Sequence, residues 1–174
     1  MDPKMDPRIK RVPPNIGYYL AGFADGEGSF MVVIRPRKDY RIPWKVSLCF
    51  NVSQGDRVIL SLFKRYLGCG TLRERVDGVC YYEVNNLNAI IQNVIPFFER
   101  FPFLSAKKKA DFARFKKLAR MISEGRHLTE EGIKEILRIR LAMNAGGKRR
   151  YSDKEIPSKI HGSSETTRKA RRKQ

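Results

Sequence analysis

The 174-residue sequence predicts an α+β fold in which a four-stranded antiparallel sheet carries helices on one side. Apolar residues recur at helical spacing in three segments, near residues 16–27, 57–67 and 107–123. Two pairs of strand-like segments lie between these helices and are rich in β-branched residues or alternate between apolar and polar ones. The expected core order is α-β-β-α-β-β-α, with further helices toward the C-terminus.

The first helix is expected to span about three turns, because Ile16, Tyr19, Leu20 and Phe23 recur at helical spacing. Gly28 is placed to end this helix in the left-handed conformation, which glycine adopts without steric penalty. The helix would therefore stop directly before the first strand.

Two acids, Asp25 and Glu27, fall in the last turn of this helix. The helix dipole disfavours negative charge at that end by about 0.3–1 kcal/mol for each acid. A sequence shaped only by stability would carry Lys or Arg there. We therefore expect a positive species, most simply a divalent metal ion, to complete the site.

Two glycines, Gly22 and Gly26, lie four residues apart and hence on one face of the same helix. Glycine inside a helix costs about 1 kcal/mol relative to alanine. Two glycines in so short a helix are explained if another backbone approaches it closely. The alternative is a surface helix whose C-terminal turn is loosely ordered.

The first pair of strands is expected at Ser29–Arg35 and Trp44–Ser53, joined by a loop. The second of these strands alternates apolar and polar residues, so one face would pack on a core and the polar face could contact a partner. A helix follows over Arg57–Leu67, with Asp56 as its N-cap and Gly68 at its end.

The second pair of strands, Thr71–Val76 and Val79–Asn85, flanks Asp77-Gly78, the strongest short-range signal for a hairpin. A two-residue turn pairs position 75 with position 80, and position 73 with position 82. Four side chains are then expected to share one sheet face: Arg73, Arg75, Cys80 and Tyr82.

Helices are expected after the hairpin. Asn86 is an N-cap for a helix over residues 87–101, which we expect Pro96 to kink or break. Residues 107–123 carry an apolar face opposite a basic one, and residues 129–143 predict a last helix.

The chain is expected to hold a single domain over residues 15–147. Residues 1–14 are expected to form an N-terminal extension. Residues 148–174 are basic with few apolar side chains, which predicts a flexible tail or one ordered only on a polyanion.

The charge balance points to a polyanionic partner. Lys and Arg number 36 against 18 Asp and Glu, a net charge of +18. Nucleic acid is favoured over an anionic membrane as this partner. No apolar run approaches the ~18 residues of a spanning helix. Three cysteines without CxxC spacing and two isolated histidines argue against a disulfide framework and a zinc site. The start lacks the apolar core of a signal peptide, so we expect an intracellular protein.

The segment Leu20–Gly28, LAGFADGEG, resembles the nine-residue signature of the LAGLIDADG homing endonucleases, with the usual continuation Ser29-Phe30. The second acid is Glu27 where the motif that names the family has Asp, and either side chain supplies a carboxylate. No second copy of the motif follows. The resemblance therefore implies the single-motif subclass, which acts as a homodimer, in bacterial cytoplasm or an organelle.

The resemblance also implies roles in a metal site. Glu27 would be the metal ligand, assisted by the carbonyl of Gly26, with Mg²⁺ as cofactor and Ca²⁺ or Mn²⁺ able to substitute. Asp25 would brace the turn, and Gly22 with Gly26 would form the dimer interface.

Two catalytic positions follow from the same resemblance. Gln54 would position water at the end of the second strand, and Lys107 would lie near the scissile phosphate. The register of the lysine is open by one residue, so Lys108 is the alternative.

A polar sheet face loaded with basic residues is typical of a β-sheet that reads the major groove of DNA. The residues expected to contact DNA are Val33, Arg35, Arg37, Lys38, Tyr40, Lys45, Ser47, Asn51, Arg73, Arg75 and Tyr82.

The function predicted is a site-specific, Mg²⁺-dependent homing endonuclease encoded within an intron. It would cut both strands of a long, roughly palindromic DNA duplex and leave short 3′ overhangs. Two alternatives stay open: an intron RNA maturase or non-cutting DNA-binding regulator on the same scaffold, and general electrostatic association with nucleic acid.

Overall fold

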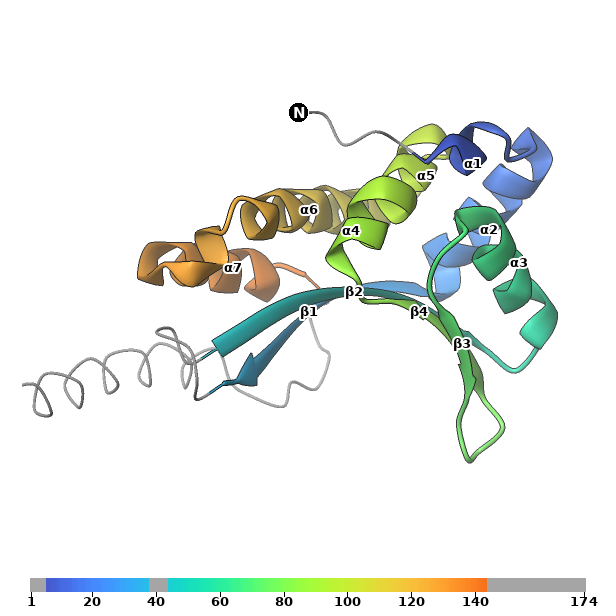
Figure 1. Ribbon diagram of the computed structural model, residues 1–174. Helices are drawn as coiled ribbons and strands as arrows, with labels where there is room; N and C mark the ends of the chain where they lie inside the picture. Colours follow the sequence, from blue (N-terminus) through green and yellow to red (C-terminus); the bar gives the residue numbers. More distant parts are fainter. Residues whose placement is uncertain (1–5, 38–43, 144–174) are drawn as a thin grey trace, which may run out of the picture. The chain divides into compact units, whose positions relative to one another are not determined.

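The computed structural model describes residues 6–37 and 44–143, and its elements follow the predicted order (Figure 1). The helices and strands are α1 Pro7–Lys10, α2 Pro14–Glu27, β1 Gly28–Pro36, β2 Trp44–Gln54, α3 Arg57–Leu67, β3 Thr71–Glu74, β4 Cys80–Val84, α4 Leu87–Ala89, the π-helical η1 Ile90–Val94, α5 Ile95–Arg100, α6 Ala106–Ser123, the 3₁₀-helical η2 Arg126–Leu128 and α7 Glu130–Leu141. The four strands form one sheet in the order β1-β2-β4-β3. The predicted α+β class is therefore confirmed.

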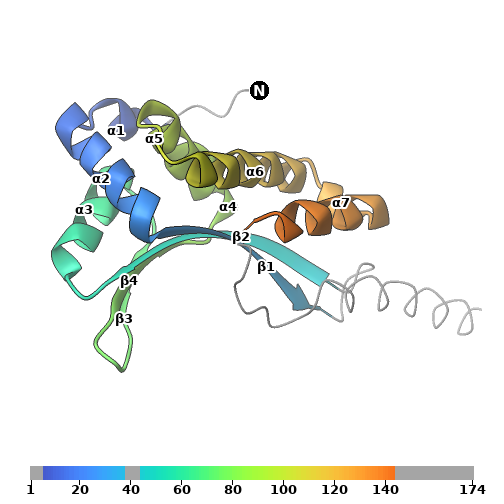
Figure 2. The ribbon, with the colours of Figure 1, turned by 180° about the vertical axis from the view of Figure 1, so that it is seen from behind.

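Two compact units share this chain. Unit 1 comprises the described residues of Met1–Met31 and Leu48–Ala119, and unit 2 those of Val32–Ser47 and Arg120–Gln174. Within unit 1, strand β4 pairs antiparallel with both β2 and β3. The β3–β4 hairpin extends beyond the helices of unit 1, as both ribbon views show (Figures 1 and 2).

An aromatic cluster forms the centre of unit 1. Phe30, at the start of β1, is almost fully buried. The centroid of its ring lies 4.8–5.9 Å from those of five other rings: Phe50, Phe98, Phe103, Phe112 and Phe115. Ring pairs at such separations are favourable beyond the area they bury. The corner between α2 and β1 is therefore held rigidly against the core.

The hairpin register differs from the prediction by one residue. The Arg75 N–H donates to the Val79 carbonyl at 2.9 Å, and the Gly78 N–H donates to the Arg75 carbonyl at 2.9 Å. The loop therefore has three residues, the last of which is Gly78 with φ +80°. Loops of this length with a left-handed third residue are the next commonest hairpins after two-residue turns.

This register moves Tyr82 to the other side of the sheet. Arg73 pairs with Tyr81 and Glu74 pairs with Cys80, so the predicted pairing of Arg73 with Tyr82 is wrong. Tyr82 is fully buried, and its hydroxyl donates to the Cys69 carbonyl at 3.0 Å. A one-residue slip exchanges the two faces of a strand, because side chains alternate with a period of two.

Pro96 interrupts the predicted helix over residues 87–101, as expected, but does not end it. A π-helical turn precedes α5. Proline has no N–H to donate four residues back. In a regular α-helix the N–H of residue 96 would donate a hydrogen bond to the Gln92 carbonyl. Here that carbonyl accepts a hydrogen bond from the Asp6 N–H at 3.1 Å instead. The N-terminal segment thus satisfies the acceptor that Pro96 leaves open.

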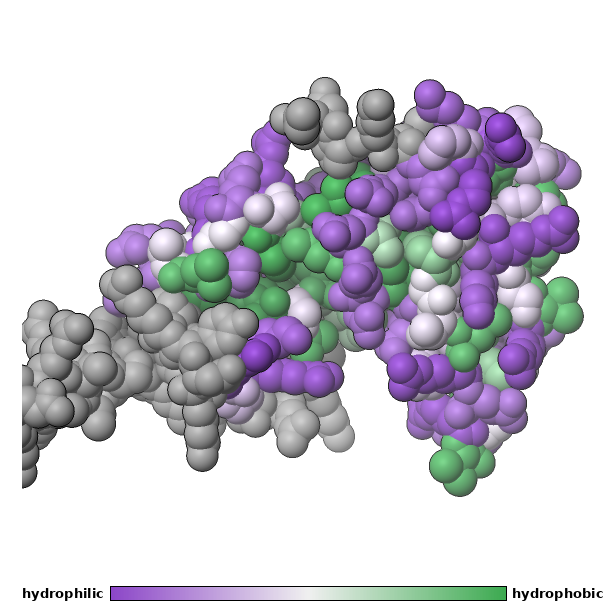
Figure 3. All heavy atoms as spheres, viewed as in Figure 1, coloured by the Kyte–Doolittle hydropathy of each residue, from purple (hydrophilic) through white to green (hydrophobic). Residues whose placement is uncertain are grey.

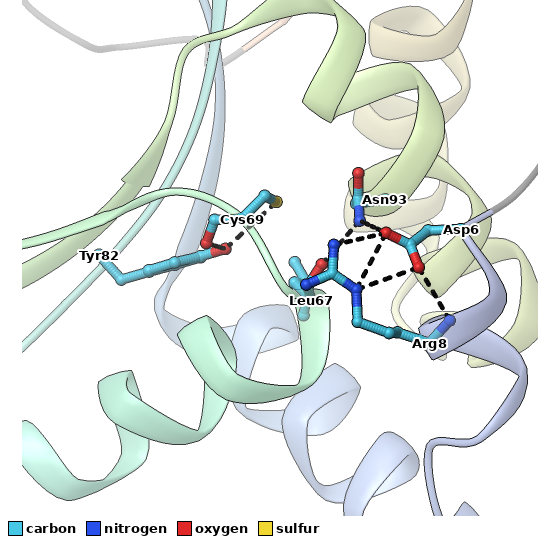
Figure 4. Close-up of polar contacts among 6 residues, drawn as sticks. All are labelled: Asp6, Arg8, Leu67, Cys69, Tyr82 and Asn93. Carbon is cyan, nitrogen blue, oxygen red and sulfur yellow. Dashed lines mark hydrogen bonds and ion pairs between the residues drawn. The ribbon is translucent and has the colours of Figure 1, made fainter.

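Asp6 links this segment to the rest of unit 1 through hydrogen bonds (Figure 4). Its carboxylate accepts hydrogen bonds from the Arg8 guanidinium at 2.7 Å and from Asn93 Nδ2 at 3.0 Å, and Asn93 Nδ2 also donates to the Leu67 carbonyl at 2.9 Å. The hydrogen bonds from Arg8 are the largest influence holding the pKa of Asp6 far below its usual range. Ile9 is also fully buried. Much of the stretch expected to be an extension is therefore packed structure.

In unit 2, helix α7 begins where predicted. The Thr129 hydroxyl accepts from the Gly132 N–H at 3.1 Å, and Ile133, Ile136 and Leu137 are buried. Arg126 forms an ion pair with Glu135. Among the described residues, no helix has the length and apolar character needed to cross a membrane.

Candidate active site

The C-terminus of α2 joins β1 without an intervening loop. Gly28 has φ −77° and ψ 148°, so the predicted left-handed cap is wrong. Glycine is needed there for space, because a Cβ would lie 2.6 Å from the Ala24 carbonyl oxygen. The Gly28 N–H donates to that same oxygen. The turn into β1 leaves Glu27 exposed at the corner.

Asp25 has a structural partner 80 residues along the chain. Its carboxylate accepts from the backbone N–H of Ser105 at 3.0 Å and of Leu104 at 3.2 Å, and the Ser105 hydroxyl also donates to it. Helix α6 begins at the next residue, so Asp25 satisfies donors at the entry to that helix. The expected bracing role of Asp25 is confirmed.

Replacement of Asp25 by Asn is expected to destabilise the fold by about 1 kcal/mol at pH 7, because hydrogen bonds to a neutral amide are weaker than those to a carboxylate. Burial alone would raise the pKa of Asp25, but the hydrogen bonds from Ser105 and Leu104 and the charge of Lys108 lower it overall. Because the folded-state pKa is depressed, this stabilisation is complete above the usual Asp pKa near 4 and is lost as the pH falls below it.

Denaturant unfolding between pH 2 and pH 7 measures this effect. The stability difference between the parent and Asp25→Asn should shrink toward zero at the acid end. Ser105→Ala is the matched control, since it removes a donor without removing a charge and should cost stability at every pH. A constant difference for Asp25→Asn across the whole range would contradict the assignment.

Lys108 lies at the same corner. Its ammonium group donates to the Gly28 carbonyl, and the side chain is half-buried. Burial lowers the pKa of Lys108, while the charges of Asp25 and Glu27 act in the opposite direction. Lys107 is exposed instead, and its ammonium group lies 3.9 Å from a carboxylate oxygen of Asp111. Consecutive helical residues point about 100° apart, so only one of the two lysines can face the corner.

Gln54 ends strand β2, opposite Cys80. Its side-chain oxygen accepts from the Gly55 N–H at 2.7 Å, which leaves the amide NH₂ group to point elsewhere.

Metal-binding chemistry at the corner fits a hard cation. Glu27 offers a carboxylate, and the last carbonyls of a helix, Gly26 among them, have no intrahelical donor. Oxygen donors of this kind suit Mg²⁺ and Ca²⁺. Across residues 6–37 and 44–143, no group of three or more His, Cys, Asp or Glu side chains is arranged to hold an ion.

The glycine face of α2 is open. Gly22 and Gly26 are exposed, and a Cβ built on either would meet no atom within 4 Å. Tyr18 and Tyr19 on the same helix are also more than half exposed. Packing among the described residues therefore gives no reason for glycine at either position.

The residues predicted to contact DNA fall into three groups. In unit 1, Arg73 and Arg75 are exposed and Asn51 is half-buried. The predicted DNA contact by Tyr82 is wrong, because this side chain lies in the core. In unit 2, exposed or half-buried side chains are Val33, Arg35, Arg37, Lys45 and Ser47. Lys38, Tyr40 and the tail at 148–174 lie outside the described residues.

The corrected register also brings forward two residues that the sequence did not indicate. Tyr81 and Glu83 occupy the face of β4 that carries Arg73 and Asn51 across the ladder. Only the length of the hairpin loop could have revealed them. Val76, in the loop of this hairpin, is fully exposed. Figure 3 shows apolar residues, in green, among the hydrophilic ones on this side of the molecule.

Comparison with known proteins gives a consistent set of relatives. A family model described as LAGLIDADG endonuclease matches residues 20–119. A probable intron-encoded endonuclease of Neurospora crassa is 32% identical over 132 residues, which are 74% of this chain and 29% of that protein. The homing endonuclease I-ApeII of Aeropyrum pernix is 31% identical over 102 residues, 58% of this chain and 60% of that protein. The chain thus spans less than two thirds of the length of either relative.

Among solved structures, the archaeal intron-encoded homing endonuclease I-Vdi141I complexed with DNA superposes with a TM-score of 0.76 at 27% identity. The match covers 86% of this chain and 96% of that one. The fold and the order of its elements are therefore shared along almost the whole of that protein.

Proposed function

The chain belongs to the LAGLIDADG endonuclease family, and on this premise we propose that it is a metal-dependent homing endonuclease that acts as a homodimer. Its substrate would be a long, roughly palindromic DNA duplex, cut on both strands to leave short 3′ overhangs. The observation that carries this proposal is the exposed Glu27 at the α2–β1 corner, beside a half-buried Lys108 and with Asp25 committed elsewhere.

Gly22 and Gly26 support the homodimer. Their open face permits a second copy of α2 to approach closely, and the two-fold axis would bring Glu27 of each copy together. Two carboxylates so placed repel each other unless cations lie between them. In such a dimer the two copies would provide the metal ligands together.

Glu27 and the Gly26 carbonyl of each copy would hold Mg²⁺, for which Ca²⁺ or Mn²⁺ could substitute in binding. The bound metal would polarise the scissile phosphate and lower the pKa of water. The role of Glu27 is to fix the ion at the corner, while Asp25 keeps that corner rigid by its bonds to Ser105. Gln54 would orient water through its amide group.

Lys108, rather than Lys107, is proposed as the lysine near the scissile phosphate. Its ammonium group already lies at the corner, bound to the Gly28 carbonyl. A cation there would stabilise negative charge that develops on the phosphate.

Lys108→Met is accordingly expected to slow cleavage by about 100-fold, a typical loss for a positioned proton-transfer or electrostatic group. Lys107→Met, which alters an exposed neighbour, should change the rate by no more than about threefold. Single-turnover cleavage at saturating protein measures both rates. A large loss in Lys107→Met with none in Lys108→Met would reverse the assignment.

The sheet is proposed to read DNA in the major groove. Its exposed Arg and Lys side chains can pair with guanine or with phosphates, and Asn51 can pair with adenine. The relative complexed with DNA supports the same use of the scaffold.

The test is cleavage of the uninterrupted form of the host gene by the purified chain. We expect a double-strand break at one position with Mg²⁺ and none with a chelator. Binding to this DNA without cleavage under any divalent metal would refute the endonuclease and leave a DNA-binding protein.

A further inference from the structure

The sheet face of unit 1 carries one acid at its centre. The register places Glu83 between Asn51 on β2 and Thr71 on β3. The neighbouring row consists of Ser53, Tyr81 and Arg73. A carboxylate in this place repels phosphates, so it opposes the non-specific attraction that the rest of the chain provides.

Among the described residues, one cation, Arg73, forms an ion pair with Glu83. The Arg73 Nε lies 3.8 Å from a carboxylate oxygen of Glu83, and the two side chains are 59% and 21% exposed. A single contact at that distance between partly exposed groups contributes little to stability. Burial raises the pKa of the Cys49 thiol to about 11, and the negative charge of Glu83 acts in the same direction. Stability therefore gives no reason for an acid at this position.

Glu83 and Arg73 together offer a hydrogen-bond acceptor beside a donor, which complements the major-groove edge of one base pair. In the major groove a C·G pair presents the cytosine amino donor beside the guanine O6 and N7 acceptors. The amino group and O6 are hydrogen-bonded to each other, so they lie about 3 Å apart. A carboxylate acceptor and a guanidinium donor 3.8 Å apart match this edge in both polarity and spacing.

We propose that Glu83 and Arg73 together read one C·G base pair in each half of the target. Glu83 accepts a hydrogen bond from the cytosine amino group, and Arg73 donates to the guanine of the same pair. This specificity rests on the proposed function, because it requires the sheet to enter the major groove.

The test measures base preference. The full-length chain is incubated with Mg²⁺ and a library in which every base pair of its cleavage target is varied in turn. The parent should prefer C·G at one position of each half-site by about tenfold. Glu83→Gln, nearly the same shape, should lose that preference or shift it to A·T, because glutamine pairs with adenine. Other positions should change by less than about twofold.

Glu99→Gln is the matched control. Glu99 is another ion-paired glutamate of unit 1, half-exposed and bound to Lys116, and its replacement should leave the profile unchanged. Arg73→Ala, at an exposed position that the fold tolerates, should weaken the preference at the same base pair. A Glu83→Gln profile identical to the parent's, or a uniform gain for all sequences, would overturn the inference. A parent that selects no sequence would instead refute the proposed function.

Discussion

Replacing Glu27 by glutamine is expected to abolish DNA cleavage while target binding stays within about threefold of the parent, since the substitution adds no bulk and removes a negative charge near phosphate. A metal ligand of this kind supports several kcal/mol of transition-state stabilisation, so the cleavage rate should fall by about a thousandfold or more. Glu27 is exposed at the helix end, which means that the fold should be unaffected.

Cleavage with Mg²⁺ and equilibrium binding with Ca²⁺ separate these two effects. Glu99→Gln again serves as control, because it removes an exposed carboxylate of unit 1 far along the chain from the corner. Undiminished cutting by Glu27→Gln would show that the metal ligand is another residue. Loss of binding together with cutting would show that Glu27 holds the DNA rather than the catalytic ion.

The second large effect is expected from Gly22→Leu. Outside the backbone of α2 itself, no described residue lies within 4 Å of a Cβ at this position, and leucine is a better helix former than glycine by about 0.5–1 kcal/mol. The isolated subunit should therefore become slightly more stable. In the homodimer the leucine side chain of each copy would force the two helices apart. Each of the two leucines would weaken dimerisation by about 1–3 kcal/mol.

Self-association should thus weaken by at least about 30-fold, and cleavage should be lost at protein concentrations where the parent is active. Sedimentation measures the first quantity. Unfolding at a concentration low enough for monomers measures the stability. Ala113→Leu, which adds a leucine side chain at an exposed position of α6, should alter neither self-association nor cleavage. A Gly22→Leu protein that remains dimeric and active would disprove the proposed interface.

Helix α3 illustrates how far local sequence signals extend. Its bounds, Arg57–Leu67, are those predicted from the apolar spacing. The Asp56 side chain accepts from the Val58 N–H at 2.8 Å, and Gly68 takes the left-handed conformation with φ +68°. Each of these signals acts over at most four residues, so the neighbouring sequence alone can specify it.

The β3–β4 hairpin illustrates where such signals fail. Asp77-Gly78 predicts a turn, but its loop has three residues because the buried position belongs to Tyr82. The core decides which residue of the strand faces inward, and that decision involves Cys69 and side chains distant in sequence. The partly exposed position of Glu83 on the opposite face follows from the same register.

The amino-acid sequence alone determined the element order, the caps of individual helices and the glycine-acid motif that identifies the family, since periodicity, capping and turn chemistry are properties of short segments. Tertiary structure decided which acid braces the corner, which lysine faces it and which side of the hairpin is open. Those outcomes depend on partners such as Asp25 and Ser105, 80 residues apart, whose meeting is set by packing of the whole core.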